Sequence, residues 1–409
     1  MMKAVMYGAG NIGRGFIAER FYLSGYHTTF IDVNLEVVNA MNEAGKYPIF
    51  VTRGDAYVPD WVENISAVNG RDEQAVVAAI AEADVMATAL GANILPFVAP
   101  LIAKAISARK AANKPLNILI CENLVGSGEY LKGLVAPHVP AEDQAFFEEN
   151  IGFVSVSVGR TVPPTADEFK AQHPLAVCAD VYSELPADAT QFRPVGGEIP
   201  PVKGLVPFSP FSFYIERKLL VHNMGHALTT YIAYQKGLET IYDAVCDGEI
   251  KYVLFRALVE SARALAKRRG VPTDDMMQFV EELMVRFENK LLVDTLDRVG
   301  RDPKRKLSPD DRLVGAFRMV KEEGGCPAHI AVGIAAGYLF DMPGDAAAAE
   351  ISAYTTENGI EKALATYSGI TDAEDVAMIK TFYDLFVAKA PFSRFVEVLS
   401  EMKGKYAHH

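Results

Sequence analysis

The sequence predicts an α/β chain made of an N-terminal Rossmann-type doubly wound parallel sheet and a mainly α-helical C-terminal domain. Three observations support this prediction. Short apolar runs alternate with helical stretches over the first 200 of the 409 residues, a pattern typical of parallel sheets. A glycine-rich turn follows the first apolar run. From residue 201 onwards nearly every segment has helical periodicity.

In the N-terminal half, a strand over residues 3–7 precedes the glycine-rich turn, and residues 12–24 read as the helix after it. A second strand over 28–31 ends at Asp32. Later segments repeat the pattern, with strands at 85–89 and 117–121, a helix at 95–109 between them, and β-rich stretches at 152–160 and 175–183.

The domain boundary is expected near residue 200, where prolines are frequent. These prolines are Pro186, Pro194, Pro200, Pro201, Pro207 and Pro210. The expected domains are therefore residues 1–200, which would bind a nucleotide, and 201–409, which would bind the substrate. The clearest helices of the second domain are expected at 211–236, 250–269, 274–287 and 328–340.

Composition excludes several classes of protein. The formal net charge of −12 disfavours non-specific nucleic-acid binding. Four widely spaced cysteines without a C-x-x-C pair, and the lack of H-E-x-x-H, argue against a disulfide framework and a zinc site, so no metal is expected. We expect a cytoplasmic protein without a membrane partner, because no signal peptide is recognisable and the longest apolar run, 330–340, is too short to span a bilayer. His408 and His409 read as the start of a purification tag.

The glycine-rich turn Gly8-Ala9-Gly10-Asn11-Ile12-Gly13, followed by Arg14, is a G-x-G-x-x-G motif between a strand and a helix. In this setting the motif predicts a dinucleotide site. Gly8 allows the tight turn, Gly10 the approach of the pyrophosphate, and Gly13 close packing of helix on strand. The helix N-terminus would face the pyrophosphate.

Asp32 lies nineteen residues after Gly13, at the end of the second strand. Its carboxylate would accept hydrogen bonds from the adenosine ribose and repel a 2′-phosphate, so NAD is favoured over NADP. Two alternatives stay open, a glycine-rich turn without a ligand and a flavin nucleotide.

Lys218, Asn223 and His226 stand within nine residues of an apolar helical segment. In an α-helix they would lie at about 0°, 140° and 80° around the axis, so all three can face one cleft. Lys218 can accept the proton of an alcohol if burial or nearby positive charge lowers its pKa. Asn223 and His226 can donate hydrogen bonds to the developing alkoxide. From the trio alone, a snorkelling lysine with an asparagine and a histidine satisfied in the core is the commoner outcome.

The pattern Lys-x-x-x-x-Asn-x-x-His resembles the signature of the polyol-specific long-chain dehydrogenases. Further stretches extend the resemblance over nearly the whole chain, namely residues 8–15, Cys-Glu-Asn at 121–123, Glu-Arg-Lys-Leu at 216–219, and Arg-Val-Gly-Arg-x-Pro-x-Arg-Lys-Leu at 298–307. The resemblance implies a metal-independent, NAD-dependent enzyme. It implies that Lys218 is the general base, that Asn223 stabilises the oxyanion, and that His226 contacts the substrate.

The strand with Ser155 and Gly159 departs from the family pattern, and Asn123 is a further candidate site residue. Ser155 and Gly159 stand where relatives often have Asp or Asn, which puts a second oxyanion contact from that strand in doubt. Asn123 follows a strand at the carboxyl edge of the sheet, where ligands bind in this architecture, so we assign it to the nicotinamide region. The alternative is that Asn123 caps the next helix.

Six cations occur within fifteen residues, at Arg298, Arg301, Lys304, Arg305, Lys306 and Arg312. Such a run is usually a solvated face, and interleaved aspartates can neutralise part of it. The resemblance implies that Arg298 and Lys306 approach the sugar chain. We infer that Arg301 and Arg305 bind a phosphate, the ligand that arginine binds best, and that Lys304 is solvated.

The resemblance, together with these residues, implies reversible oxidation of D-mannitol 1-phosphate to D-fructose 6-phosphate with NAD, and we expect a monomer or weak dimer. One alternative is a sibling dehydrogenase for an unphosphorylated polyol or a hexuronate. Another is an NAD(H)-binding sensor without catalysis.

Overall fold

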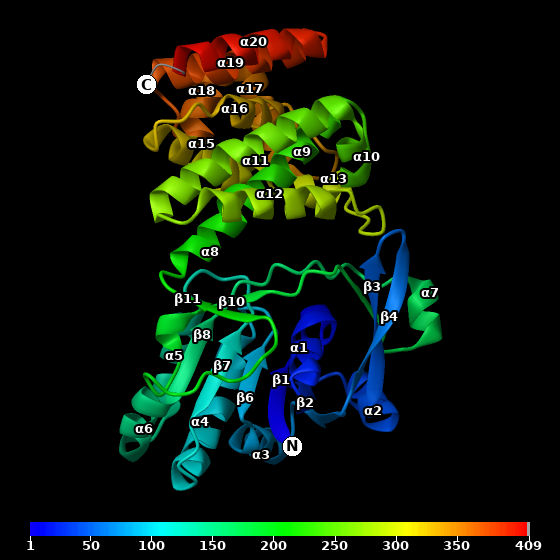
Figure 1. Ribbon diagram of the computed structural model, residues 1–409, viewed down its shortest axis with the longest axis vertical. Coiled ribbons are helices and arrows are strands. Elements are labelled where there is room, and N and C mark those ends of the chain that lie inside the picture. Colours follow the sequence, from blue (N-terminus) through cyan, green and yellow to red (C-terminus); the bar gives the residue numbers. More distant parts are fainter. Residues whose placement is uncertain (407–409) are drawn as a thin grey trace. The chain divides into compact units, whose positions relative to one another are not determined.

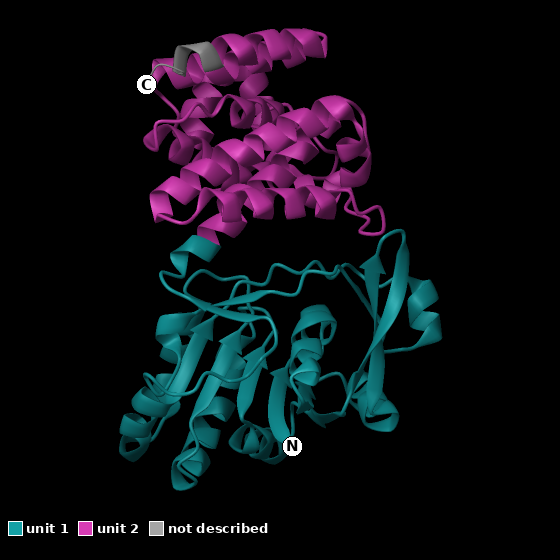
Figure 2. Cartoon of the chain, viewed as in Figure 1, with its two compact units in different colours: residues 1–214 teal, residues 215–409 magenta. Residues whose placement is uncertain are grey.

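The computed structural model describes residues 1–406, with side chains described for residues 1–402. His408 and His409, read as part of a tag, lie outside the described residues. The chain divides into two compact units, residues 1–214 and 215–409 (Figure 2).

The first unit is built on a six-stranded sheet in which every neighbouring pair is parallel (Figure 1). Its strand order is β5-β2-β1-β6-β7-β8, the order of a doubly wound dinucleotide-binding sheet. The strands are β1 (Met2–Tyr7), β2 (Tyr26–Asp32), β5 (Ile65–Asn69), β6 (Val85–Thr88), β7 (Leu116–Ile120) and β8 (Ile151–Ser155). The predicted fold class is therefore confirmed.

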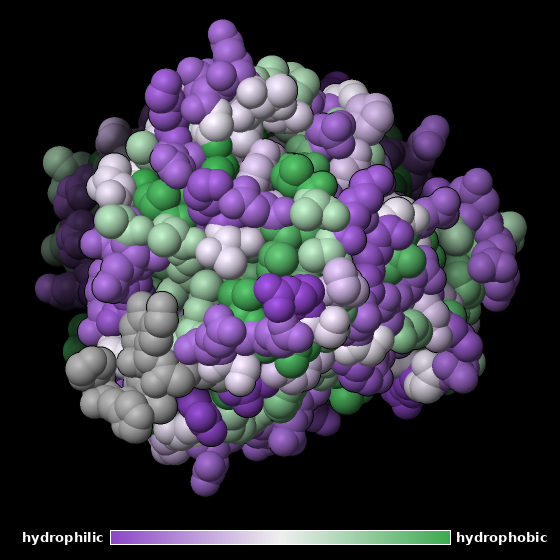
Figure 3. All heavy atoms as spheres, turned by 90° about the horizontal axis from the view of Figure 1, so that it is seen from above, coloured by the Kyte–Doolittle hydropathy of each residue, from purple (hydrophilic) through white to green (hydrophobic). Residues whose placement is uncertain are grey.

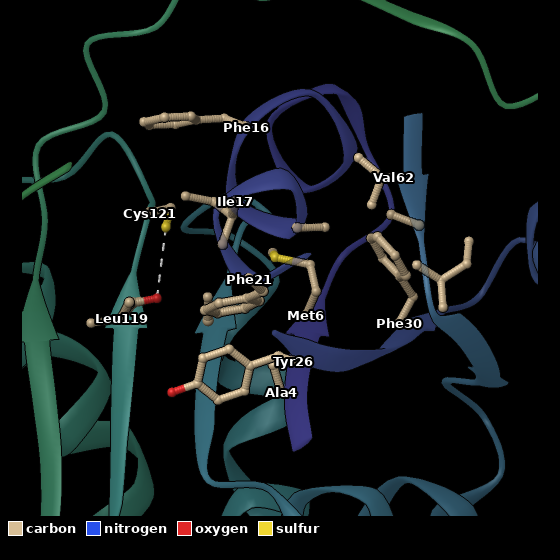
Figure 4. Packing of buried hydrophobic residues seen from close by; sticks show 14 of the residues in the cluster. Ala4, Met6, Phe16, Ile17, Phe21, Tyr26, Phe30, Val62, Leu119 and Cys121 are labelled. Atoms are coloured by element: carbon tan, nitrogen blue, oxygen red, sulfur yellow. Dashed lines mark hydrogen bonds between the residues drawn. The ribbon is translucent and has the colours of Figure 1, made fainter. Parts of the chain in front are cut away.

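Side chains of β1 alternate between two cores on opposite faces of the sheet. Ala4 and Met6 belong to one core, and Val5 and Tyr7 to the other. In the first core the helix that follows the glycine turn packs on the sheet through Phe16, Ile17 and Phe21 (Figure 4). Burial on both faces explains why these strands read as continuous apolar runs.

Helices of the first unit cover both faces. The π-helical turn Gly13–Ile17, α1 (Ala18–Leu23) and α2 (Leu35–Ala44) pack on the Met6 side, while α3, α4 and α5 contribute to the Val5 side. The remaining helices are α3 (Glu73–Glu82), α4 (Leu95–Ala111), α5 (Ser127–Val135), α6 (Gln144–Asn150) and α7 (Asp167–Gln172).

Several strands of this unit were not foreseen. A hairpin of β3 (Lys46–Arg53) and β4 (Ala56–Glu63) pairs with the short β9 (Val177–Ala179), and β10 (Leu185–Asp188) pairs with β11 (Leu205–Phe208). The β-rich stretches expected at 152–160 and 175–183 are mostly not strand, because β8 ends at Ser155 and β9 is only three residues long.

Among the described residues of the second unit, helices make up the regular structure apart from an isolated bridge between Thr240 and Thr295, and each predicted helix is present. The expected helix at 211–236 is a continuous run of α8 (Ser212–Glu216), a π-helical turn (Arg217–Asn223) and α9 (Met224–Gln235). The other helices are α10 (Ile241–Cys246), α11 (Gly248–Arg269), α12 (Thr273–Phe287), α13 (Leu296–Gly300), α14 (Pro303–Lys306), α15 (Arg312–Glu322), α16 (Ala328–Gly337), α17 (Ala346–Asn358), α18 (Ile360–Ala363), α19 (Ala373–Val387) and α20 (Phe392–Tyr406).

The helix α16 lies at the centre of this unit, with every one of its residues buried. It packs on α9, where Gly333 faces Leu228 so closely that an added Cβ would lie 2.7 Å from its side chain. Gly225 allows a similar approach of α11 through Leu258. These small residues bring α9 into contact with α11 and α16, which fixes the helix that carries the predicted catalytic trio.

The surface that carries α19 and α20 mixes charged and apolar side chains (Figure 3). Within residues 1–406, no helix combines the length and the apolar character needed to cross a bilayer.

Candidate active site

The glycine turn is held by backbone contacts to the neighbouring strands. Gly8 adopts φ +106°, and its N–H donates to Ile31 O at 2.9 Å. A Cβ on Gly13 would lie 2.1 Å from Gly8 O, whereas a Cβ on Gly10 would meet no protein atom within 4 Å. Two glycines of the motif therefore serve packing, and Gly10 leaves space beside the loop.

Asp32 binds the glycine turn directly. Its Oδ2 accepts from Ala9 N–H at 2.7 Å, and its Oδ1 accepts from Asn34 N–H at 2.9 Å. Carboxylate oxygens can accept more than one hydrogen bond, so Asp32 can still accept from a ribose hydroxyl. The Asp32 carboxylate thus holds the glycine turn in place, in addition to the ribose contact predicted for it.

The remaining residues of the motif differ in exposure. The helix begins at Asn11, which is exposed, while Ile12 packs against the core. The guanidinium of Arg14 donates to Ala9 O at 2.8 Å and to Leu175 O at 2.6 Å. In this arrangement Arg14 braces the loop, and its contact with a cofactor remains a prediction.

Asn123 is exposed three residues after the end of β7, at the carboxyl edge of the sheet. It does not cap the next helix, because α5 begins with Gly126 as its N-cap. Its neighbour Glu122 is buried and accepts from Thr88 Oγ1 at 2.7 Å and from Leu90 N–H at 3.0 Å. Glu122, which the sequence did not single out, joins the loops that follow β6 and β7.

Ser155 and Gly159 are engaged in packing. Ser155 Oγ accepts from Gly128 N–H at 2.9 Å, and a Cβ on Gly159 would lie 2.7 Å from the ring of Tyr182. The two residues that depart from the family pattern therefore each have a structural contact in this chain.

In the second unit, Lys218 and Asn223 both lie in the π-helical turn and His226 lies in the first turn of α9. The hydrogen bonds of a π-helix run from residue i to i+5, so Lys218 and Asn223 lie one turn apart. The expected angles around the axis assumed an α-helix and are wrong for this turn. Ser261 Oγ of α11 donates to Leu220 O at 2.7 Å and holds the turn in place.

Burial and positive charge act on the trio. Burial, followed by the charge of Arg312, lowers the pKa of Lys218. Burial also lowers the pKa of His226 to about 3, with contributions from Arg298, Arg312 and Lys306. Both changes favour the neutral forms that proton transfer and hydrogen bonding to an alcohol require.

His226 presents a buried polar atom without a hydrogen bond. Its Nε2 lies 3.1 Å from Asp294 Oδ2, but the geometry does not make a hydrogen bond, and within the described residues this atom has no other partner. The ring stacks on Phe287 with 5.2 Å between centroids. An unsatisfied buried nitrogen is destabilising, and a substrate hydroxyl would satisfy it.

His222 lies beside His226, with 6.1 Å between ring centroids. Its ring meets Phe287 edge-on at 5.7 Å, and burial lowers its pKa well below the usual value. His222 is therefore partly buried and packs against these rings.

The predicted phosphate and sugar contacts divide into separate groups. Arg298 pairs with Asp294, and buried Lys306 donates to Arg301 O. Burial, then Arg312 and Arg305, lowers the pKa of Lys306 to about 8. The charges of Arg298 and Lys306 thus act on His226, whereas Arg301 is exposed.

Two further cations of the run have carboxylate partners. Arg305 pairs with Asp302 at 3.1 Å and with Asp311 at 3.3 Å, and Lys304 pairs with Glu350 at 2.8 Å. Lys304 is half-exposed, in line with the solvated position expected for it.

Arg312 is the member of the run that sequence reasoning left without a role. It begins α15, and its Nε donates to Asp311 Oδ1 at 2.7 Å. Its charge lowers the pKa values of Lys218, His226 and Lys306. Only its place in the run of cations could have pointed to it.

Both parts of the chain match families of known proteins. Residues 2–199 match the family described as the mannitol dehydrogenase Rossmann domain, and residues 211–387 match the mannitol dehydrogenase C-terminal domain. The chain belongs to the mannitol dehydrogenase family. As a member of this family it is an NAD-dependent oxidoreductase.

One curated relative is the mannitol-1-phosphate 5-dehydrogenase of Geobacillus thermodenitrificans (strain NG80-2). It is 37% identical over 380 residues, which cover 92% of this chain and 97% of the relative. Two solved structures share the fold at low identity. The Pseudomonas fluorescens mannitol 2-dehydrogenase complex with NAD and D-mannitol has a TM-score of 0.67 at 17% identity and covers 98% of this chain and 94% of that one. A substrate-free D-sorbitol dehydrogenase has a TM-score of 0.76 at 16% identity and covers 95% and 94%.

The described residues contain no group of three or more His, Cys, Asp or Glu side chains placed to bind a metal ion.

Proposed function

We propose that this member of the mannitol dehydrogenase family catalyses D-mannitol 1-phosphate + NAD⁺ ⇌ D-fructose 6-phosphate + NADH + H⁺. The observation that carries the proposal is the 37% identity to a mannitol-1-phosphate 5-dehydrogenase over nearly the full length of both chains. Residues 1–200 would bind the cofactor and residues 201–409 the substrate.

The glycine turn fits NAD. The space beside Gly10 would admit the pyrophosphate, and the helix that begins at Asn11 would face it. Asp32 would accept from the adenosine ribose, and Asn123 would lie by the nicotinamide. When bound, NAD supplies the hydride acceptor for the C5 carbon of the polyol.

Lys218 would accept the proton of the C5 hydroxyl as the general base and return it to the ketone oxygen in reduction. Its lowered pKa increases the neutral fraction of the amine. Asn223 would donate to the oxygen as it gains charge, and His226 would hold a neighbouring hydroxyl. We propose that these groups act without a metal ion.

The basic run would hold the other end of the substrate. We propose that Arg298 and Lys306 contact the sugar hydroxyls and that Arg301 and Arg305 contact the phosphate. The charge around His226 supports an anionic substrate, since Arg298, Lys306 and Arg312 all act on this ring. A phosphate at Arg305 would compete with Asp302 and Asp311 for the same guanidinium.

The substrate is tested by NADH oxidation with fructose 6-phosphate, fructose and fructuronate. We expect the highest kcat/KM with fructose 6-phosphate. A preference for either unphosphorylated compound would instead identify a sibling polyol or hexuronate dehydrogenase. NADH binding without turnover of any of the three would identify a sensor.

The role of Lys218 is tested with Lys218→Met. We expect kcat to fall by about 10²–10⁴, as is typical for loss of a general base, while the Kd for NADH stays the same. Lys304→Met is the matched control, because Lys304 pairs with Glu350 and should be dispensable. Near-normal turnover of Lys218→Met at neutral pH would exclude this mechanism, and inhibition by a chelator would exclude metal independence.

We also propose that the enzyme works in the cytoplasm as a monomer or weak dimer without nucleic-acid or membrane partners. The net charge of −12 supports the absence of a nucleic-acid partner. Light scattering after gel filtration, at several protein concentrations, measures the oligomeric state.

A further inference from the structure

A charged pocket lies in the helical unit, on α11 and at the C-terminal end of α15. Its volume is about 260 Å³. On α11 the cations Arg256, Arg263 and Lys267 line it, and the loop at 324–326 closes the α15 side. Their spacing of seven and four residues places the three cations on one face of the helix.

Arg256 and Arg263 differ from most arginines of this unit because they have no ion pair within the described residues. By contrast, Arg268 and Arg269 on the same helix pair with glutamates. Moreover, Arg256 Nε is buried without a hydrogen-bond partner in the described chain. A buried unsatisfied donor is destabilising, and an anion in the pocket would offset that cost.

The two carboxylates at the pocket are engaged elsewhere. Glu260 accepts from His329 Nδ1 and from the backbone N–H groups of His329 and Ile330, at the start of α16. Glu323 pairs with Arg268 at 3.1 Å. The charge left toward the pocket is therefore positive, in a chain whose net charge is negative.

We propose that this pocket binds a small phosphate-bearing anion through Arg256 and Arg263, with Lys267 at its rim. Arginine pairs with phosphate in a bidentate geometry, and both arginines line the same pocket. The volume is below the range of about 300–1,000 Å³ that is usual for drug-sized ligands, so it suits inorganic phosphate or a short phosphate monoester.

The pocket is separate from the residues proposed to bind substrate. Ser261, which holds the π-helical turn through Leu220 O, points about 140° away from Arg256 around α11. The helix therefore uses one face for the predicted catalytic turn and another for the pocket. Failure of the proposed substrate specificity would leave this inference intact.

Cys326 lines the pocket and gives a local readout. The full-length protein is alkylated with iodoacetamide, with and without inorganic phosphate at constant ionic strength, and each cysteine is quantified by mass spectrometry. We expect phosphate to slow alkylation of Cys326 several-fold and to leave exposed Cys246 unchanged. The double variant Arg256→Met/Arg263→Met should lose the protection, whereas Arg394→Met, which removes an exposed arginine paired with Glu397, should keep it.

Calorimetry gives a second measurement that does not depend on the thiol. Phosphate is titrated into Arg301→Met/Arg305→Met protein, which removes the two arginines proposed to bind the substrate phosphate. We expect one remaining phosphate site, which the added Arg256→Met/Arg263→Met changes remove. Equal Cys326 protection in the Arg256→Met/Arg263→Met variant, or no heat of binding in the Arg301→Met/Arg305→Met protein, would overturn the proposal.

Discussion

At the scale of single residues, Asp32 shows how one side chain can support both the local structure and the proposed site. Its two oxygens bind Ala9 N–H and Asn34 N–H, so the carboxylate holds the glycine turn in place before any ligand arrives. Gly8, Gly10 and Gly13 differ in whether the surrounding backbone leaves room for a side chain. A side chain would collide with the backbone at Gly8 and Gly13 but not at Gly10.

The glycines can be separated by mutation. Gly10→Ala should leave the thermal unfolding midpoint unchanged and raise the Kd for NADH about tenfold, or ~1.4 kcal/mol, because its Cβ occupies only the space beside the loop. Gly13→Ala should lower the midpoint, because its Cβ would lie 2.1 Å from Gly8 O. NADH fluorescence titration and calorimetric melting measure the two effects. Unchanged NADH affinity in Gly10→Ala would refute the pyrophosphate assignment.

Arg312 should set the pH at which Lys218 acts. Oxidation needs the neutral amine, so its rate rises as pH increases through the Lys218 pKa. Arg312 lowers that pKa, and Arg312→Gln should therefore move the rising limb of kcat against pH to higher pH. Arg312→Lys keeps the charge and should restore most of the original profile. A glutamine variant with lower activity but an unmoved limb would show that Arg312 acts only through packing.

At the scale of elements, the π-helical turn Arg217–Asn223 is the main local feature of the helical unit. It interrupts a run that is otherwise α-helical from Ser212 to Gln235 and sets the direction of Lys218 relative to His226. Turns of this type often occur at functional sites, because the extra residue changes the register of one side chain without ending the helix.

Inserting one residue tests this element. Residues four apart lie one turn apart in an α-helix, and the π-helical turn extends this spacing to the five residues from Lys218 to Asn223. One alanine inserted after Leu219 should rotate Lys218 away from Asn223 and abolish turnover, with little loss of helix content. One alanine inserted after Ala365, which is exposed in the π-helical turn Leu364–Ser368, is the matched control and should keep activity. Circular dichroism and steady-state kinetics give the two readouts. Full activity after the insertion next to Leu219 would mean that the register of this turn is irrelevant to catalysis.

At the scale of the whole molecule, the two units accommodate polar groups in their interiors differently, one by ion pairs and the other by a neutral histidine. In the first unit, buried Glu19 pairs with Arg160 and with Arg20. In the second unit, His226 is largely buried, with its side chain 20% exposed, and lies beside several cations. Its pKa of about 3 makes the stability of the protein depend on pH.

The direction of this dependence follows from proton binding. Unfolded histidine binds a proton below about pH 6.5, whereas folded His226 does so only near pH 3. Its contribution to stability is therefore complete above about pH 6.5 and is lost as pH falls toward 3. His226→Gln should reduce the slope of unfolding free energy against pH in this window by about 1.4 kcal/mol per pH unit.

Urea unfolding followed by circular dichroism at a series of pH values measures that slope. The control is His138→Gln, since His138 is exposed and should not change it. An unchanged slope in His226→Gln would contradict the depressed pKa of the buried ring.

Much of the fold followed from local pattern. The strands β1, β2, β6 and β7 are buried on both faces and read as apolar runs, and the long helices of the second unit have clear periodicity. The hairpin β3–β4 was not predicted because most residues of β4 are exposed and the strand contains Pro59, a residue typical of turns and strand edges. Its pairing with β9, over a hundred residues away, depends on contacts that no local window contains.

The polar trio shows the same division. The sequence by itself determined that Lys218, Asn223 and His226 share one helix and that a dinucleotide motif opens the chain, because spacing and residue type are local properties. Only the tertiary structure decided the π-helical register, the burial that makes Lys218 and His226 prefer their neutral forms, and the approach of Arg312 from another helix. Burial and electrostatic fields depend on which distant segments pack together, and local sequence does not specify that packing.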